Sequence, residues 1–146
     1  MLIPNLDFVD LDRKIWRGGQ PDDPGWNQLK ANGITHVIKL NEESEGTDIT
    51  AEALGMAVFS LPISLLEQIL TEPSKHAILQ AVDYIGDNTF IHCEHGQDRT
   101  GLVVGVYRVL KQGWSKQDAE DEMLAHGFHK ILLGLWDYWQ HEVKSP

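Results

Sequence analysis

The sequence of 146 residues predicts an α/β fold, with a central, mostly parallel sheet flanked by helices on both faces. Short apolar segments of strand length alternate along the chain with longer segments of helical periodicity. The strand expected at residues 89–92 runs into a loop and then into an almost uniformly apolar helix. This places a loop at the carboxyl end of a strand, where α/β proteins bind ligands. We expect residues 1–146 to form one domain.

The first strand is expected at residues 14–17, where the sequence reads K-I-W-R, followed by a turn at residues 18–21 with the sequence G-G-Q-P. Asp23 is a predicted N-cap, because Pro24 then takes the first helical position, which proline favours. Gly33 is expected to end this helix.

The next strand is expected at residues 34–40, where I-T-H-V-I-K-L alternates, and a polar loop follows at residues 41–46. Thr47 can cap a short helix that runs to Leu54. Residues 57–61 read as a further strand, after which a proline opens a long connection.

A helix is expected to begin at residues 72–73 and to end at residues 86–87, because one stripe of it is apolar. The strand at residues 89–92 follows, and the helix over residues 100–111 is apolar on nearly every side, so it is predicted to be buried at the centre of the fold. Gly113 is expected to stop it.

Ser115 and Asp118 suggest a capping box for a helix that runs to about His126. The last helix carries an apolar stripe at helical spacing, which we interpret as core packing rather than as a partner surface. The stripe consists of Ile131, Leu132, Leu135, Trp136 and Trp139.

Composition and charge exclude several functions. The formal net charge of −10 argues against nucleic acid as a partner, and it disfavours polyanionic substrates unless the site has its own positive patch. The chain has one cysteine, so it has no internal disulfide, and a required thiolate suits a reducing compartment. The first residues show neither a basic region nor a long apolar run. We therefore expect a cytoplasmic protein without a signal peptide or membrane span.

The loop after residues 89–92 carries the chemistry. Cys93 opens it and Arg99 closes it at the start of a helix. A helix N-terminus and a guanidinium both favour the thiolate form of a nearby cysteine. Arg99 can hold two oxygens of a phosphate at once, and the backbone amides of residues 94–99 can hold the others. Attack by Cys93 on phosphorus then gives a phosphocysteine intermediate, which water cleaves.

The flanking residues of this loop have supporting roles in the same hypothesis. The hydroxyl of Thr100 could donate to the Cys93 sulfur and stabilise it as a leaving group in the second step. The ring of His92 could brace the loop from behind by bonding to backbone. The expected phosphate-binding residues are Glu94, His95, Gly96, Gln97, Asp98 and Arg99.

This loop resembles the signature of the cysteine-dependent protein tyrosine phosphatase superfamily, H-C-x-x-G-x-x-R-T, with which it agrees at His92, Cys93, Gly96, Arg99 and Thr100. The run K-I-W-R-G-G-Q-P, followed by a helix and I-T-H-V-I-K-L, is similar to the N-terminal part of small dual-specificity phosphatases. The resemblance covers most of the chain and implies a tyrosine-phosphatase-like fold, phosphomonoesterase activity and no cofactor.

The general acid is the point at which the chain departs from this pattern. The superfamily usually protonates the leaving oxygen with an aspartate on a loop after an earlier strand, and the corresponding segment of this chain contains no aspartate. Asp98 is one candidate, since myotubularin-type lipid phosphatases carry an aspartate at the matching place, although it could instead orient the arginine or cap the helix. Glu67, Glu72 and Asp48 are the other candidates.

Glu94 bears on the substrate, because H-C-E-x-G-x-x-R-T is similar to the loop of bacterial tyrosine-phosphatase-like phytases, which act on inositol polyphosphates. Arg17 and Lys39 lie near predicted strand ends, so they could border the cleft and contact such a substrate. An inositol polyphosphate is therefore the first expectation for the substrate. A dual-specificity or tyrosine protein phosphatase is the alternative, and a low-activity module that binds phosphorylated ligands is the second.

Two clusters of the sequence contain histidines of the kind that can bind a metal. His92, Cys93 and His95 lie on one tight loop, where three ligands cannot easily converge, and their spacing differs from that of zinc motifs. His126 and His129 flank Gly127, a predicted helix end, and two histidines without carboxylate or cysteine partners are more often surface residues than ligands. We therefore expect no metal.

Overall fold

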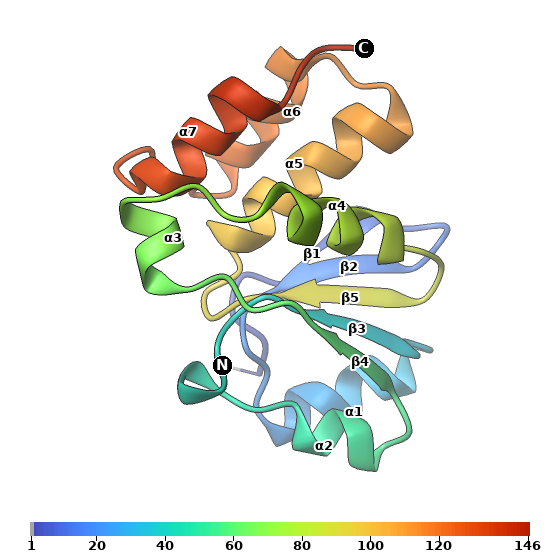
Figure 1. The fold of residues 1–146 in the computed structure, drawn as a ribbon. Helices are drawn as coiled ribbons and strands as arrows, with labels where there is room; N and C mark the ends of the chain where they lie inside the picture. The colour runs from blue at the N-terminus through green and yellow to red at the C-terminus, as the bar shows by residue number, and fades with distance from the viewer. Residues whose placement is uncertain (1) are drawn as a thin grey trace.

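The computed structural model describes residues 2–146 and is a layered α/β structure (Figure 1). The polar loop predicted at residues 41–46 contains one turn of 3-10 helix, η1. In chain order the elements are β1 (Asp7–Asp10), β2 (Ile15–Gly18), α1 (Asp23–Ala31), β3 (His36–Lys39), η1 (Glu43–Glu45), α2 (Ile49–Ala53), β4 (Ala57–Ser60), α3 (Leu65–Ile69), α4 (Lys75–Tyr84), β5 (Thr89–His92), α5 (Arg99–Gln112), α6 (Lys116–Ala125) and α7 (Leu133–Glu142).

The sheet has five strands in the order β1-β2-β5-β3-β4. The pairs β2–β5, β5–β3 and β3–β4 are parallel, and only the edge pair β1–β2 is antiparallel within the described residues 2–146. The mostly parallel sheet that the sequence predicts is therefore confirmed. In the register of the central strands, His92 lies opposite Gly18 of β2 on one side and Lys39 of β3 on the other. The segments that leave β2 and β3 thus flank the loop that leaves β5.

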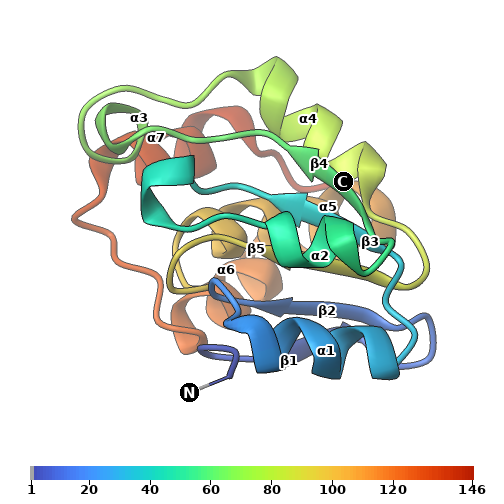
Figure 2. The same ribbon diagram turned by 90° about the horizontal axis from the view of Figure 1, so that it is seen from below.

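Helices cover both faces of the sheet, as predicted. The helices α1 and α2 lie on one face, and α4 to α7 lie on the other (Figures 1 and 2). A smaller apolar core under α1 and α2 is built around Trp26 and Phe90, and a larger one surrounds α5. The helix α5 is buried through most of its length, and Trp139 of α7 packs on Gly105, where an added Cβ would lie 2.9 Å from the indole ring.

Local sequence signals place most of the element boundaries. Thr89–His92 is a strand as predicted, and Gly113, with φ of 70°, ends α5 in the left-handed conformation that glycine tolerates. The N-cap of α1 is Asp22 rather than Asp23, because the Asp22 carboxylate accepts the N–H of Gly25 at 2.8 Å. Pro24 remains in the first turn, where its missing N–H costs nothing.

Besides η1, two elements were not predicted, and one helix begins later than expected. The edge strand β1 has one buried residue, Val9, so its apolar signal is weak. The short helix α3 lies inside the predicted long connection and exposes its leucines to solvent. The next helix begins after Ser74, whose hydroxyl accepts the N–H of Ala77, rather than at residues 72–73.

The apolar residues of the stripe predicted for the last helix lie in two different environments. Leu135 and Trp139 are fully buried, which confirms core packing, whereas Ile131 lies before α7 with 80 % of its surface exposed. Among the described residues, no helix combines the length and the apolar character that crossing a membrane requires.

Candidate active site

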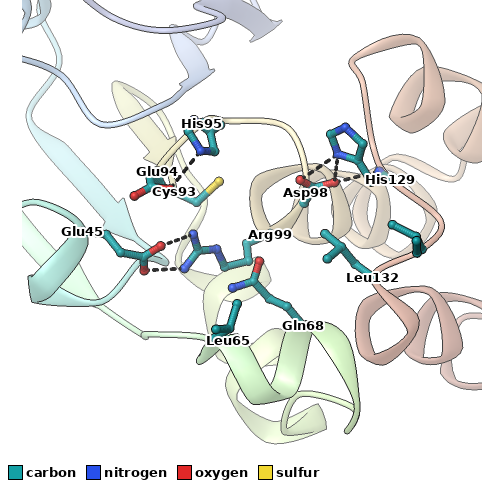
Figure 3. A pocket seen from close by; sticks show the side chains of 11 residues that line it. Glu45, Leu65, Gln68, Cys93, Glu94, His95, Asp98, Arg99, His129 and Leu132 are labelled. Atoms are coloured by element: carbon teal, nitrogen blue, oxygen red, sulfur yellow. Dashed lines mark hydrogen bonds and ion pairs between the residues drawn. The ribbon is translucent and has the colours of Figure 1, made fainter.

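The loop between β5 and α5 forms the floor of a cavity of about 350 Å³ (Figure 3). Cys93, which precedes the first turn of α5, lies on this floor together with four further residues of the loop. Short segments after β3, on α3 and before α7 supply the walls. The lining residues are Glu45, Leu65, Gln68, Cys93, Glu94, His95, Asp98, Arg99, His129, Ile131 and Leu132.

Cys93 is held at the floor by its own loop. It is 2 % exposed, and its Sγ accepts the backbone N–H of Gly96 at 3.2 Å. Within residues 2–146, the backbone N–H groups of Glu94, His95, Gln97 and Asp98 donate to no protein acceptor. The loop therefore offers a set of amide donors beside the Cys93 sulfur, which is an arrangement suited to binding an anion.

The segment after β2 supports the loop from the opposite side. Gly96 has φ of 80°, and a Cβ on it would lie 2.4 Å from the carbonyl carbon of Gly18, so the backbones touch there. The N–H of Gln20 donates to the carbonyl of Glu94 at 2.9 Å. The run G-G-Q-P is predicted as a turn, and in the structure it also supports the loop between β5 and α5.

Arg99 is oriented by a carboxylate that the sequence did not reveal. Its Nη1 and Nη2 donate to the two carboxylate oxygens of Glu45, each at 2.8 Å, and Nη1 also donates to the Ile63 carbonyl at 3.2 Å. Its Nε is buried and has no partner in the described part of the chain. The edge of the guanidinium formed by Nε and Nη2 is therefore left for a ligand.

This ion pair fixes the charge state of both groups. Burial lowers the pKa of Arg99, but the hydrogen bonds with Glu45 and the negative charges of Cys93, Glu45 and Glu94 together outweigh it, so the pKa is raised overall. The hydrogen bonds from Arg99 hold the pKa of Glu45 below its ordinary value. Glu45 lies on η1, where its Oε1 also accepts the N–H of Glu42 at 2.9 Å. The polar sequence N-E-E-S-E-G gave no indication of which of its three glutamates would face the arginine.

His92 braces the loop from behind. Its Nδ1 lies 3.1 Å from the carbonyl of Cys93, and its Nε2 lies 2.7 Å from Oδ2 of Asp48, with both side chains buried. Asp48 also accepts from the Gln20 amide at 2.9 Å. The structure thus places Asp48 behind the loop and away from the cavity lining, where it orients His92 and cannot meet a leaving group.

Thr100 is buried, and its hydroxyl has no hydrogen-bond partner among residues 2–146. The bond to the Cys93 sulfur that we expected is therefore not formed in this structure.

The expectation that Arg17 and Lys39 border the cavity is not supported, because both side chains are buried outside its lining. Arg17 lies on the sheet face that α5 covers, and its Nη2 donates to the carbonyl of Gly96 at 3.1 Å. Burial lowers the pKa of Arg17. The Nζ of Lys39 donates to the carbonyl of Asn41 at 2.9 Å and lies 3.5 Å from Glu43. Both cations donate to loop carbonyls and lie outside the cavity lining.

The structure also places the three remaining candidates for the general acid, of which two lie outside the cavity lining. Glu67 forms a capping box with Ser64 at the start of α3, and its Oε1 accepts the Ser64 N–H at 3.0 Å. Glu72 is exposed outside the cavity lining. Asp98 does line the cavity, and its Oδ1 accepts the backbone N–H of His129 at 2.7 Å.

The histidines of the two clusters lie close to carboxylates. His95 pairs with Glu94 at 2.9 Å, and His126 pairs with Asp7 at 2.8 Å. Among residues 2–146, no group of three or more histidine, cysteine, aspartate or glutamate side chains is placed to hold a metal ion.

The family of dual-specificity-type protein tyrosine phosphatase domains described as "DSP-PTPase phosphatase fused to NAD+ Kinase" matches residues 2–133. The chain belongs to this family. It is thus a phosphatase domain of the cysteine-dependent protein tyrosine phosphatase superfamily, as the signature at Cys93 and Arg99 predicts.

Curated relatives match over different lengths. The dual-specificity protein phosphatase TpbA of Pseudomonas aeruginosa is 48 % identical over 50 residues, which are 34 % of this chain and 22 % of that protein. The inositol diphosphatase DSP4 of Arabidopsis thaliana is 27 % identical over 128 residues, which are 84 % of this chain and 64 % of that protein. The chain thus spans less than two thirds of the length of either relative.

Solved structures show the same fold. The core catalytic domain of the PP-IP phosphatase SIW14 from S. cerevisiae has a TM-score of 0.79 at 20 % identity, covering 97 % of this chain and 87 % of that chain. P. aeruginosa TpbA has a TM-score of 0.75 at 23 % identity, covering 94 % of this chain and 84 % of that chain.

Proposed function

We propose that the chain hydrolyses phosphomonoesters through a phosphocysteine intermediate formed on Cys93. The observation that carries this proposal is the placement of the Cys93 sulfur on the floor of the cavity, beside unpartnered loop amides and the open edge of Arg99. These donors suit the three oxygens of a phosphoryl group, and they favour the charge that develops on them during transfer.

The reaction has two steps. The Cys93 thiolate attacks phosphorus, an S–P bond forms, and the P–O bond to the leaving group breaks as that oxygen takes up a proton. Water then attacks phosphorus and loses a proton, the S–P bond breaks, and inorganic phosphate leaves. Nε and Nη2 of Arg99 hold two phosphoryl oxygens in both steps, while Glu45 keeps the opposite edge of the guanidinium fixed.

The cavity lining favours a single phosphate on an apolar or aromatic body, such as phosphotyrosine. Three carboxylates line it, whereas Arg99 is the sole arginine or lysine among its lining residues in the described part of the chain. Leu65 and Ile131 give it an apolar wall, and more than half of the surface of each of these residues is exposed. Additional phosphates on a substrate would meet carboxylates, and an apolar body would bury these side chains.

An inositol polyphosphate is the second candidate. The residue Glu94 in H-C-E-x-G-x-x-R-T favours it, and relatives of this chain carry the name inositol diphosphatase. The cations it would need are His95 and His129 of the lining, with Lys130 next to the latter in the chain. A low-activity module that binds phosphorylated ligands is the third reading, and the presence of both Cys93 and Arg99 speaks against it.

The test compares wild type with Cys93→Ser on a phosphotyrosine peptide, inositol hexakisphosphate and p-nitrophenyl phosphate. We expect wild type to release phosphate from the peptide and the aryl ester, and Cys93→Ser to release none. A preference for the inositol substrate would establish the second candidate, and turnover by Cys93→Ser would overturn the nucleophile assignment. Binding of phosphorylated ligands without turnover by wild type would leave the third reading.

Trapping supplies an independent readout of the mechanism. Wild type quenched in acid during turnover of a radiolabelled substrate should retain label on Cys93, while Cys93→Ser should retain none. Turnover without any label on the cysteine under rapid quenching would contradict a phosphocysteine intermediate.

A further inference from the structure

The cavity needs a proton donor for the leaving oxygen, and most of its carboxylates are already engaged. Glu45 is held ionised by Arg99, which keeps its pKa below the ordinary value. Glu94 pairs with His95, and Asp98 accepts hydrogen bonds from His129. A carboxylate that accepts such bonds in its ionised form has no proton to give. The donor must therefore be sought among the other groups of the lining.

We propose that His129 is the general acid of the reaction and that Asp98 is the residue that positions it. This inference rests on the proposed cysteine mechanism. His129 lies in the segment between α6 and α7, lines the same cavity as Cys93, and keeps 56 % of its side chain exposed, so its ring can reach a bound ester.

The geometry of the pair supports this assignment. Oδ1 of Asp98 accepts the backbone N–H of His129 at 2.7 Å, and the ring nitrogen Nδ1 lies 3.0 Å and 3.1 Å from the two carboxylate oxygens (Figure 3). The side chain of Asp98 is only 16 % exposed. A mostly buried carboxylate therefore fixes the ring through Nδ1, and Nε2 is the nitrogen that remains free to donate a proton.

His95 is the other histidine of the lining, and its attachment differs. Its Nε2 pairs with Glu94, and both side chains of that pair are well exposed, so the ring is weakly held. His129 is instead fixed by a backbone and a ring contact to the residue directly before Arg99. The His129 ring is thereby held next to the arginine that is proposed to bind the phosphoryl group.

The proton balance closes over the two steps. As the Cys93 sulfur bonds to phosphorus and the P–O bond breaks, the protonated His129 ring gives its Nε2 proton to the leaving oxygen. The neutral ring then accepts a proton from the attacking water, whose oxygen bonds to phosphorus as the S–P bond breaks. His129 ends the cycle protonated and Cys93 ends it as the thiolate.

The experiment measures kcat/KM for wild type, His129→Gln, Asp98→Asn and His95→Gln on a series of aryl phosphates that runs from p-nitrophenyl to phenyl and an alkyl ester. A general acid typically contributes 10²- to 10⁴-fold when the leaving group is poor. His129→Gln should therefore lose about a hundredfold on the alkyl ester and only a few-fold on p-nitrophenyl phosphate. Asp98→Asn should also lose more kcat/KM on the alkyl ester than on p-nitrophenyl phosphate, but each loss should be smaller.

The variants separate a catalytic role from a structural one. The backbone N–H of His129 can still donate in His129→Gln, and the side-chain amide oxygen that Asp98→Asn introduces can still accept it. Neither change therefore removes the link between the loops. The matched control, His95→Gln, should keep the wild-type dependence on the leaving group.

Several outcomes would overturn the proposal. An equal loss of kcat/KM on every ester in His129→Gln would show a structural role alone. If the loss of kcat/KM increased steeply with poorer leaving groups in Asp98→Asn but not in His129→Gln, Asp98 would be the general acid. If such an increase occurred only in His95→Gln, His95 would be the general acid. Failure of the cysteine mechanism is distinguished by Cys93→Ser, which would then retain turnover on p-nitrophenyl phosphate regardless of the histidine variants.

Discussion

The ion pair between Glu45 and Arg99 yields the sharpest prediction, because it joins the arginine that we propose to bind phosphate to a residue outside the signature. Glu45→Gln preserves the shape of the side chain, but its amide offers one acceptor in place of two, and its NH₂ group faces a guanidinium donor. A hydrogen bond to a charged group contributes about 1.5–3 kcal/mol. The Glu45 side chain is 23 % exposed, so solvent screening favours the lower figure.

A loss of about 1.5 kcal/mol corresponds to roughly a tenfold decrease in kcat/KM, since about 1.4 kcal/mol makes a factor of ten. The assay is steady-state hydrolysis of p-nitrophenyl phosphate at neutral pH, with thermal unfolding measured on the same samples. Glu43→Gln is the matched control, because Glu43 lies on the same turn, is well exposed and pairs with Lys39 at 3.5 Å rather than with the arginine. It should stay within about twofold of wild type.

Two results would refute this reasoning. If Glu45→Gln were as active as wild type, the carboxylate would not be needed to orient Arg99. If it were more active, Glu45 would be a competitor that the substrate phosphate must displace, and the open Nε edge would not be the binding edge.

Three further predictions concern the same loop. Gly96→Ala should lower the melting temperature by several degrees and nearly abolish turnover. The reason is that a side chain at φ of 80° costs about 1–2 kcal/mol and that its Cβ would lie 2.4 Å from the Gly18 carbonyl carbon. A variant that is active and as stable as wild type would contradict this contact. Arg17→Met should reduce kcat/KM about tenfold, because it removes a hydrogen bond to the loop. The loss of stability should be small, because a buried charge is removed at the same time. Unchanged kinetics would show that this hydrogen bond does not hold the loop in place. The third prediction concerns pH, because Arg99 lowers the pKa of Glu45 in the folded protein. The stability that the pair contributes is therefore present above the ordinary pKa of about 4.3 and is lost as pH falls through the lower folded value, so the melting temperatures of wild type and Glu45→Gln should converge in that acidic range. A constant difference in melting temperature down to about pH 2 would exclude this linkage.

Local sequence signals were sufficient for the strand, the loop and the helix that form the floor of the site. The strand Thr89–His92 is short and apolar, and α5 ends at Gly113, a residue that adopts the left-handed conformation at little cost. The anion-binding loop follows from the spacing between Cys93 and Arg99, because both lie on one continuous turn into a helix. Such signals depend only on residues that are neighbours in the sequence, so they can be interpreted without knowing the rest of the fold.

The direction in which strand-end side chains point could not be predicted in the same way. Arg17 and Lys39 were expected at the cleft because they lie at the ends of strands that flank β5. The strands do flank it, but both side chains are buried beside backbone carbonyls. Which face of a strand is covered depends on helices that lie far away in the sequence, here α5 for Arg17.

The sequence by itself thus determined the fold class and the phosphatase family, and it supplied Cys93 and Arg99 as the proposed nucleophile and its arginine. Only the tertiary structure decided which residues complete the site. Glu45 bonds to Arg99, which is 54 residues away in the sequence, and His129 contacts Asp98, which is 31 residues away. The physical reason is the strand order, which places β5 between β2 and β3, so that loops from separate parts of the chain converge on one edge of the sheet.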